Sequence, residues 1–570
     1  MKTRTSRALI RSRAILMLMI LALVVGACGD DDAETGSTTT AASSGTTVAG
    51  TAAPGTTAAD TAATTTPPET GPTGTLRVSV SSFGAESIDP SMERLVSVGL
   101  FGMPIYDWLI WPGPNGEIPS PGVAVAWEVS DDNLSWTVTL RDDMIFHNGD
   151  ALTAEDVKFS IERHLREEAT SSLSGVWRAN VDSIDVLSPT ELRINLKGPW
   201  PVFPLAATPF EGAQASVQPK AYFESVGEDG VREAAVGSGP WEFVEHNEGT
   251  SFVFKASDTP HPYRPQPGFA ELEILLVPEA STRLAQLKAG EVQIAEISPS
   301  QIKEAQDAGL QILEIPNFTH TSVSFFGFGP NAEGMPIADV NVRKALSLAI
   351  NRPELIATIL GGFGEEAARF IVGPGTLGFD PSWELDPYDP AAATQLLADA
   401  GFGGGFTVRF YSAPVGGVSW IPEAIQAIAG YWQAIGVDTE IIPTDYGTLS
   451  AAYREHPIPE LLAGAAMINI AQVTQTNLTL ANAYYPSSSV VWMLPDATMD
   501  DLMAQATAAT TIDELGTRLT AATDYAHEQY VTYPLAITPS LFAATADVTG
   551  WDPFASGYIG MLFEALRPAG

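Results

Sequence analysis

The sequence predicts an α/β protein made of several domains, and three observations support this fold class. The chain has 570 residues, a length that corresponds to roughly two to four domains. Segments with the alternating pattern of strands recur between segments with the periodicity of amphipathic helices. Hydrophobic residues make up 45% of the chain, which is enough for a sizeable core. We therefore expect a multidomain globular body built from strands and helices.

The clearest local prediction is a strand, a tight turn and a helix within residues 134–164. Every second residue of the strand is large and apolar, as in a half-buried strand: Trp136, Val138 and Leu140. Asn148 and Gly149 suit the turn because both tolerate positive φ. Thr153 and Asp156 have the spacing of a capping box, and the helix that follows repeats apolar residues every four positions.

Glycine and proline mark the limits of further elements. Residues 181–187 and 190–196 have the pattern of two strands joined by a Ser-Pro turn. Gly290 and Gly401 are expected to end helices. Residues 339–360 predict two consecutive helices, the second of which opens with Asn-Arg-Pro.

The charge balance excludes some classes of partner. The chain has 29 basic and 68 acidic residues, and five of the basic ones fall within the first thirteen positions. Removal of residues 1–27 would leave 24 basic residues against the same 68 acidic ones. Such a surface repels phosphate backbones and anionic headgroups, so we do not expect nucleic acid as a partner.

The N-terminus predicts export and anchoring. Basic residues precede a short apolar run that ends in Val-Gly-Ala just before Cys28, as in a signal peptide that is cleaved after residue 27. This arrangement resembles a bacterial lipobox, which implies lipidation of Cys28; an ordinary secretory signal is the alternative. Cys28 is the only cysteine, so an internal disulfide is excluded. Residues 28–73 are rich in Thr, Ala and Ser and predict a disordered linker.

Several motifs in order resemble family 5 of the bacterial solute-binding proteins. Leu140-Arg141, Phe146, Asn148-Gly149 and Thr153-Ala-Glu-Asp-Val make up the family's characteristic strand–turn–helix. Gly-Thr-Leu at residues 74–76, Gly-Ser-Gly-Pro-Trp at 237–241 and Asp-Val-Asn-Val-Arg-Lys-Ala-Leu at 339–346 match further family motifs. The resemblance extends from residue 74 to about residue 551.

The resemblance implies a three-domain periplasmic-binding-protein architecture of type II (cluster C), with two lobes, a hinge and a ligand cleft between domains I and III. The expected divisions are domain I at 74–107, 236–318 and 531–570, domain II at 108–235 and domain III at 319–530. The strand–turn–helix then belongs to domain II, which forms little of the cleft in these proteins, so Trp136, Arg141, Phe146 and Thr153 are expected to be scaffold.

Enzyme motifs were not found. The sequence has no Gly-x-Ser-x-Gly elbow and no Walker loop, and His527-Glu528 lacks a second histidine at the zincin spacing. The seven histidines are scattered. We therefore predict a protein that is not an enzyme and that uses neither a cofactor nor a metal.

The resemblance also directs the search for ligand contacts. Family members often carry Trp-x-x-Asp in domain III, where the acid pairs with a peptide's amino group, whereas residues 466–472 here read AMINIAQ. This departure favours a neutral or weakly polar ligand held by amides. The predicted ligand-binding residues are Phe83, Glu86, Tyr106, Trp108, Phe325, Phe326, Tyr411, Trp420, Tyr446, Asn469 and Gln472; core packing is the alternative for each aromatic residue.

The resemblance implies capture of a peptide or other small organic solute outside the cytoplasm. The expected partners are the permease and ATPase subunits of an ABC importer, with the chain itself a monomer on the cell membrane. The alternative is a sensing or adhesion lipoprotein without a role in transport, and a secreted hydrolase is a third class that the missing motifs oppose.

Overall fold

The computed structural model describes residues 71–84, 86–92, 98–112, 119–171, 173–326, 334–413, 418, 420–455, 459–460, 462–472, 475–489, 496–551 and 562–569, with residues 317 and 318 described in backbone only. The chain divides into two units, Met1–Pro67 and Pro68–Gly570, and every described residue belongs to the second. The predicted signal peptide, Cys28 and nearly all of the predicted linker lie outside the described residues.

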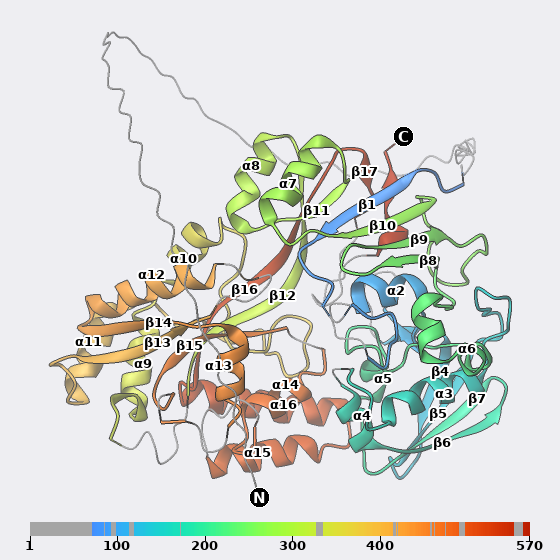
Figure 1. Cartoon of the computed structure of the whole chain (residues 1–570). Coiled ribbons are helices and arrows are strands. Elements are labelled where there is room, and N and C mark those ends of the chain that lie inside the picture. The colour runs from blue at the N-terminus through green and yellow to red at the C-terminus, as the bar shows by residue number, and fades with distance from the viewer. Residues whose placement is uncertain are drawn as a thin grey trace, which may run out of the picture. The chain divides into compact units, whose positions relative to one another are not determined.

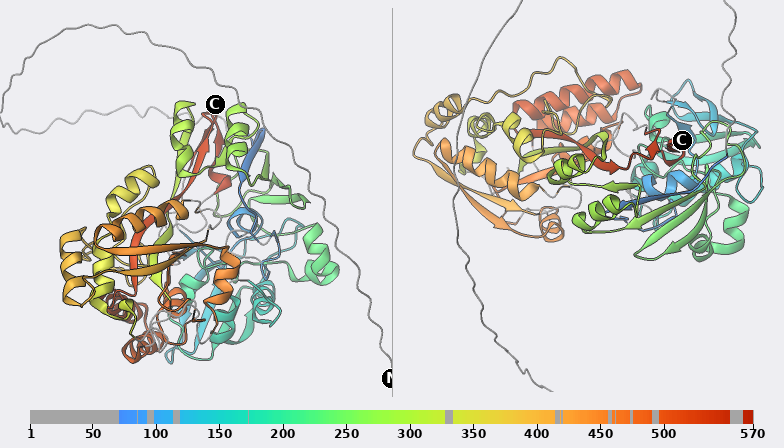
Figure 2. Two further views of the ribbon diagram at one scale, coloured as in Figure 1. Left: turned by 60° about the vertical axis from the view of Figure 1, so that its left-hand side comes forward. Right: turned by 90° about the horizontal axis from the view of Figure 1, so that it is seen from above.

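A large mixed sheet runs through the second unit (Figures 1 and 2). Its strands are β1 (Thr75–Val80), β8 (Trp241–Asn247), β9 (Ser251–Ala256), β10 (Glu271–Leu276), β11 (Ile294–Glu296), β12 (Gln311–Phe325), β13 (Phe406–Ser412), β14 (Val437–Pro443), β15 (Ala466–Ala471) and β16 (Thr532–Ala544). Among the described residues they are ordered β14-β13-β15-β12-β16-β11-β1-β10-β9-β8. β1 runs parallel to β10 and β11, and β13 runs parallel to β14 and β15; the other neighbours are antiparallel.

A smaller antiparallel sheet has the order β4-β5-β7-β6. Its strands are β4 (Ala124–Val129), β5 (Ser135–Leu140), β6 (Val181–Ser188) and β7 (Glu191–Leu196). Two-residue strands form the pairs β2 (Ile110–Trp111) with β3 (Ser120–Pro121) and β17 (Val548–Thr549) with β18 (Arg567–Pro568). The four-stranded sheet lies within the segment assigned above to domain II, although the domain boundaries themselves stay a prediction.

Helices of between one and five turns connect and cover the strands. They are α2 (Met103–Ile105), α3 (Ala154–Leu165), α4 (Ser174–Asn180), α5 (Phe203–Ala206), α6 (Lys220–Glu233), α7 (Ala280–Ala289), α8 (Ile302–Asp307), α9 (Val340–Leu348), α10 (Arg352–Ile359), α11 (Pro390–Asp399), α12 (Ile421–Ala434), α13 (Tyr446–Ala452), α14 (Leu478–Tyr484), α15 (Ala497–Thr507) and α16 (Ile512–Glu528).

The predicted strand–turn–helix is confirmed as β5, a turn and α3. The Asp156 carboxylate accepts a hydrogen bond from the Thr153 N–H at 2.9 Å, which is half of the predicted capping box. The apolar side of β5 is buried, with Val138 1% exposed and Leu140 3% exposed. Local sequence alone therefore specifies this unit.

The predicted helix ends are also confirmed. Gly290 ends α7 with a φ of 73°, and Gly401 follows α11 with a φ of 85°, a region that other residues rarely adopt. The Asn351 side-chain oxygen accepts a hydrogen bond from the Glu354 N–H and so caps α10, the second of the two consecutive helices.

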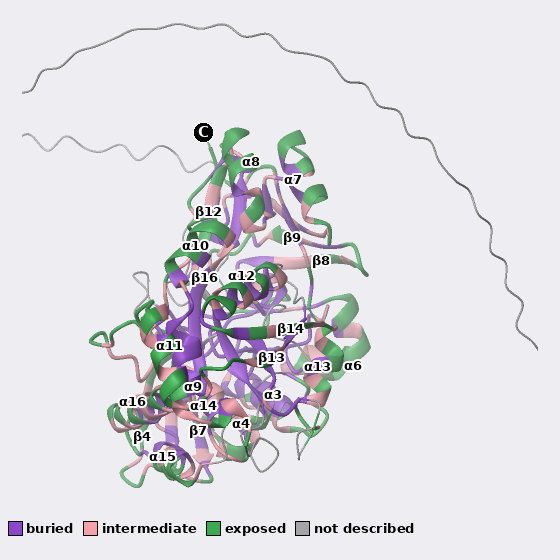
Figure 3. Ribbon diagram, turned by 90° about the vertical axis from the view of Figure 1, so that its left-hand side faces the viewer, coloured by how far each residue is buried: buried purple, intermediate pink, exposed green. Residues whose placement is uncertain are grey.

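The two faces of the large sheet contact different hydrophobic clusters. Figure 3 shows the strands β12 and β16 buried, whereas the outer sides of the helices are exposed. In the part formed by β12, β15 and β13, Val323, Phe325 and Ile468 belong to one hydrophobic cluster with α9, α10 and α12. Met467 and Tyr411, which alternate with them, belong to a different cluster. The two sides of these strands thus have different surroundings.

A buried ionic network surrounds Asp107, which follows α2. Its carboxylate accepts hydrogen bonds from Ser238, Tyr263 and Arg264 at 2.8, 2.8 and 3.1 Å, and it lies 2.9 Å from the ring of His261. Burial by itself would raise the pKa of Asp107, but His261 and Arg264 together hold that pKa well below its usual value. The carboxylate is therefore charged in the folded protein.

Candidate ligand-binding site

The candidate site begins with polar side chains on one buried face of the large sheet. In the antiparallel register of β12 and β15, Ser322 lies opposite Asn469, and Ser324 lies opposite Met467. Because strand side chains alternate between faces, His320, Ser322, Ser324 and Asn469 all occupy the same face. We call these four residues the polar row; each is at most 3% exposed.

The polar row contains hydrogen-bonding capacity that its protein neighbours do not use. The Ser322 and Ser324 hydroxyl groups lie 3.1 Å apart and pair with each other. The Asn469 side-chain nitrogen and the His320 Nδ1 are buried and have no hydrogen-bond partner among the described residues. Burial lowers the pKa of His320 to about 3, so its ring is neutral at physiological pH. Buried polar atoms of this kind are rare unless a ligand or water serves them.

Three tyrosines form a cluster near this face, and one of them contacts the polar row. The Tyr484 hydroxyl of α14 is 3.3 Å from the Ile470 carbonyl oxygen and 3.5 Å from the Asn469 side-chain oxygen. The hydroxyl groups of Tyr446 and Tyr453, at the two ends of α13, lie 3.3 Å apart. Burial, and then the proximity of Tyr446 and Tyr453, raise the pKa of Tyr484. The three tyrosines thus form one cluster.

Two phenylalanines complete the aromatic surroundings. Phe326 stacks on Tyr453 with ring centroids 5.8 Å apart, and Phe370 meets Tyr484 edge-to-face at 5.3 Å. Both rings belong to the same hydrophobic cluster as Met467 and Tyr411. Aromatic walls with a few convergent polar groups are characteristic of small-molecule sites.

Several predicted ligand residues lie at this face. Asn469 is in the polar row, Phe326 and Tyr446 belong to its aromatic surroundings, and Tyr411 lies opposite Met467 in the β13–β15 pairing. Gln472 directly follows β15, is partly exposed and is not assigned to this face. The structure therefore brings together residues that are up to about 150 positions apart in the chain.

Two predicted residues pack on the opposite face instead. Phe325 stacks on Trp432 and meets Tyr533 edge-to-face at 5.4 Å, and it is 1% exposed. Trp420 belongs to the same hydrophobic cluster as Phe325. Because Phe325 alternates with Ser324 along β12, it cannot share the polar-row face. The site proposed below includes neither Phe325 nor Trp420.

The remaining predicted residues lie in the part of the chain that precedes β5. Phe83 packs edge-to-face on Phe101 at 5.1 Å and on Phe252 at 5.3 Å. The Tyr106 hydroxyl donates to the Ile88 carbonyl oxygen at 3.0 Å. The Glu86 carboxylate lies 3.0 Å from the His246 ring, and Glu86 has a φ of 50°. The structure gives these residues internal contacts and does not join them to the polar row.

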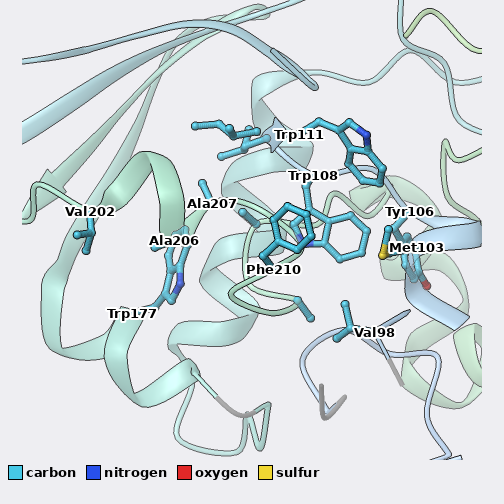
Figure 4. Close-up of a cluster of buried hydrophobic side chains, with 14 of the residues drawn as sticks. Val98, Met103, Tyr106, Trp108, Trp111, Trp177, Val202, Ala206, Ala207 and Phe210 are labelled. Carbon is cyan, nitrogen blue, oxygen red and sulfur yellow. The ribbon is translucent and has the colours of Figure 1, made fainter. Parts of the chain in front are cut away.

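Trp108 has a role in positioning a loop. It is fully buried within the aromatic cluster that includes Tyr106 and Phe210 (Figure 4). Its indole N–H donates to the Gly212 carbonyl oxygen at 2.7 Å. The loop held in this way carries Glu211, whose carboxylate accepts hydrogen bonds from the Thr476 N–H at 2.7 Å and the Thr476 hydroxyl at 3.0 Å.

Of the polar row, only Asn469 was predicted from the sequence. Ser322 and Ser324 alternate with the apolar Val323 and Phe325 in β12, and such alternation on a buried strand is a detectable signal. Tyr453 and Tyr484 carried no local signal, because helical tyrosines are common on core faces. Only strand pairing and helix packing show that these side chains converge.

The described residues show a pocket away from the polar row and no cluster of metal ligands. Among the described residues, no group of three or more His, Cys, Asp or Glu side chains could hold a metal ion. A pocket of about 290 Å³ lies between Trp136, Trp200 and the start of α16, but its lining does not include the polar row. The polar row offers hydrogen bonds and apolar contacts, which suit binding.

Comparison with known proteins gives relatives of modest identity. The glutathione-binding protein GsiB of Salmonella typhimurium is 28% identical over 332 residues, which cover 58% of this chain and 62% of that protein. The glutathione-binding protein GsiB of Escherichia coli (strain K12) is 25% identical over 441 residues, which cover 75% and 82%. The match to the Salmonella protein thus spans less than two thirds of its length.

Solved structures share the fold. NikA from Brucella suis in complex with Fe(III)-EDTA has a TM-score of 0.74 and 20% identity, covering 87% of this chain and 100% of that one. The oligopeptide-binding protein AppA from Bacillus subtilis in complex with a nonapeptide has a TM-score of 0.67 and 19% identity, covering 88% and 100%. These likenesses confirm the predicted α/β fold of a periplasmic binding protein.

A family description matches the middle of the chain. The match spans residues 119–485, which include the four-stranded sheet, the polar row and the tyrosine cluster, and it is described as "Bacterial extracellular solute-binding proteins, family 5 Middle". The predicted family is therefore confirmed. This chain belongs to family 5 of the bacterial extracellular solute-binding proteins.

Proposed function

We propose that this chain captures a small organic solute outside the cytoplasm and delivers it to the membrane subunits of an ABC importer. Family membership supports this proposal, as do relatives described as binding glutathione and a fold shared with a nonapeptide-binding protein. Family membership also supports the expectation that the chain is not an enzyme. Transport then depends on partner permease and ATPase subunits, with no chemistry on this chain.

The observation that carries the proposal is the polar row beneath the tyrosine cluster. A purely structural sheet face would be apolar, because a buried amide without a partner costs about 1–3 kcal/mol. Here one nitrogen atom each of Asn469 and His320 has no partner in the described part of the chain and lies beside aromatic walls. A bound solute would supply the missing hydrogen-bond partners and cover the rings.

We also propose that Cys28 carries a lipid that holds the protein on the extracytoplasmic face of the cell membrane. The apolar run before Cys28 and the absence of other cysteines support this assignment. Within the described part of the chain, no helix has the length and apolar character needed to cross a membrane. Cys28→Ser should release the protein from the membrane fraction; complete retention of that variant would refute the anchor.

The decisive experiment combines uptake and binding. Deletion of the gene should abolish uptake of one solute, and mass spectrometry of the native purified protein should identify that solute as a bound molecule. Asn469→Ala should weaken its binding while Asn341→Ala, an exposed residue in the first turn of α9, should not. Binding without any change in uptake would instead favour the alternative, a ligand-sensing lipoprotein without a role in transport.

A further inference from the structure

We propose that the captured solute is rich in hydroxyl or carbonyl oxygens, and that it presents an oxygen acceptor and no ammonium group to Asn469. This inference rests on the proposed function and assigns a ligand class to the polar-row face. Three features of the described residues support it: the orientation of one amide, the charge of the surrounding side chains, and the arrangement of the rings.

The orientation of the Asn469 amide follows from its contacts. The Ile470 backbone N–H, which can only donate, points at the Asn469 Oδ1 at 3.0 Å. The Tyr484 hydroxyl approaches the same oxygen at 3.5 Å. The Nδ2 group therefore faces the other way, and it has no acceptor among the described residues although Asn469 is only 3% exposed. An oxygen atom of a ligand would pair with this group.

The charge of the surroundings disfavours a cationic ligand. The polar row contains serines, an asparagine and a histidine that burial keeps neutral, and burial also raises the pKa of Tyr453 and of Tyr484. A buried ammonium group without a carboxylate would lose its hydration uncompensated, which is strongly unfavourable.

Two cations near this face reinforce the same conclusion. The Arg454 guanidinium lies over the Tyr453 ring at 5.1 Å from its centroid and donates to the Ser450 carbonyl oxygen. Arg409 lies two residues before Tyr411 on β13, so it shares the same face, and it donates to the Ala463 carbonyl oxygen at 2.9 Å. Like charges repel, so these groups oppose an approaching ammonium group.

The rings suit the apolar parts of an oxygen-rich solute. Phe326 and Tyr453 are nearly parallel, with an interplanar angle of 21°, whereas Phe370 presents its edge to Tyr484 at 82°. Aromatic faces pack on the C–H surfaces of sugars or on peptide backbones, and tyrosine hydroxyl groups and serines can pair with ligand hydroxyls. The side chains present thus complement both surfaces of such a molecule.

The test compares matched probes on the full-length protein in detergent, by thermal shift and isothermal titration calorimetry. N-acetyl-trialanine amide and free trialanine differ in their charged ends, and cellobiose provides a neutral polyhydroxylated probe. We expect at least one neutral probe to stabilise the wild-type protein and to bind more than tenfold tighter than free trialanine. Tighter binding of free trialanine than of its blocked counterpart would overturn the inference.

Asn469→Asp and Asn469→Ala test the residue itself. Either change should weaken the best neutral probe at least tenfold, and Asn469→Asp should raise the affinity for free trialanine. Asn341→Asp, in the exposed first turn of α9, is the matched control and should change neither affinity. Affinities within twofold of wild type in both Asn469 variants would refute the role of this amide.

The wild-type comparison needs no variant, so the inference stays testable even if a substitution at residue 469 prevents folding. Binding of a probe only when it carries a free ammonium group would refute the ligand class and leave solute capture standing. Failure of every solute, including those from cell extracts, to bind the wild-type protein would refute solute capture itself and the ligand class with it.

Discussion

Truncation of Glu564 to alanine should destabilise the protein strongly, because it leaves a buried arginine without its main counterion. The Arg264 guanidinium is 4% exposed and donates twice to the Glu564 Oε1, at 2.6 and 2.9 Å. It also donates to the Met103 carbonyl oxygen at 2.7 Å and lies over the Trp111 ring at 4.4 Å. Burial opposes the charge, but Glu564 and Asp107 outweigh it, so the pKa of Arg264 lies above its usual value.

The magnitude follows from the burial of both partners. Glu564 is 1% exposed, and removing one partner of a buried ion pair costs about 3–5 kcal/mol. With an m-value of roughly 3 kcal/mol/M, this corresponds to a decrease of about 1 M in the urea midpoint. Glu564→Gln should cost about half as much, since a neutral amide oxygen can still accept one hydrogen bond.

The assay is urea unfolding followed by far-UV circular dichroism for wild type, Glu564→Ala and Glu564→Gln. The control is Asp307→Ala, which removes an ion pair with Lys303 whose side chains are 65% and 84% exposed, and which should have little effect. A decrease in the midpoint of Glu564→Ala no larger than that of Asp307→Ala would refute the reasoning. It would show that Asp107 and the backbone carbonyl groups suffice for Arg264.

Three further predictions concern other buried polar groups. The folded-state pKa of Asp107 lies below its usual value, so the ionised carboxylate stabilises the folded protein above about pH 4, and this stabilisation is lost as the pH falls. Asp107→Asn should therefore lower the free energy of unfolding at pH 7. The same substitution should flatten the acid limb of a curve of stability against pH. Burial lowers the pKa of His320 to about 3 from an unfolded value near 6.5, so the free energy of unfolding should fall by about 2 kcal/mol between pH 7 and pH 5. His320→Gln should remove this pH dependence, as measured by urea titrations without ligand. An unchanged pH dependence in the variant would contradict the prediction. Glu211→Ala should cost about 2 kcal/mol and increase hydrogen exchange at the Thr476 amide, whereas unchanged protection there would show that the hydrogen bond contributes little.

Local structure could be predicted from the sequence. The alternation in β5, the spacing of Thr153 and Asp156 and the glycines at positions 290 and 401 each depend on residues within a few positions of one another. Such signals persist in any fold that contains the segment, because they reflect backbone preferences and short-range hydrogen bonds. The family also followed from motifs of this local kind, and the match over residues 119–485 confirmed it.

Only part of the candidate site could be predicted from the sequence. Asn469 became a candidate because it stands where a charged residue was expected, and Phe326, Tyr411 and Tyr446 were aromatic candidates without any means of ranking them. Phe325 was predicted beside Phe326, yet adjacent strand residues point to opposite faces, and this one stacks in the core on Trp432. The residue type alone cannot distinguish an aromatic side chain that lines a ligand site from one that packs in the core, since both kinds of position favour the same aromatic residues.

By itself the sequence determined the α/β class, the exported and acidic character of the chain, and the local strand–turn–helix unit. Tertiary structure decided which face of β12 carries the site. Period-2 alternation separates His320, Ser322 and Ser324 from Val323 and Phe325, but it does not say which set meets a ligand. Which set lines the candidate site depends on the pairing of β12 with β15, more than 140 residues later, and on the packing of α13 and α14. The physical reason is that long-range contacts bury one face of β12 in the hydrophobic core, whereas polar groups on the other face have no partner among the described residues.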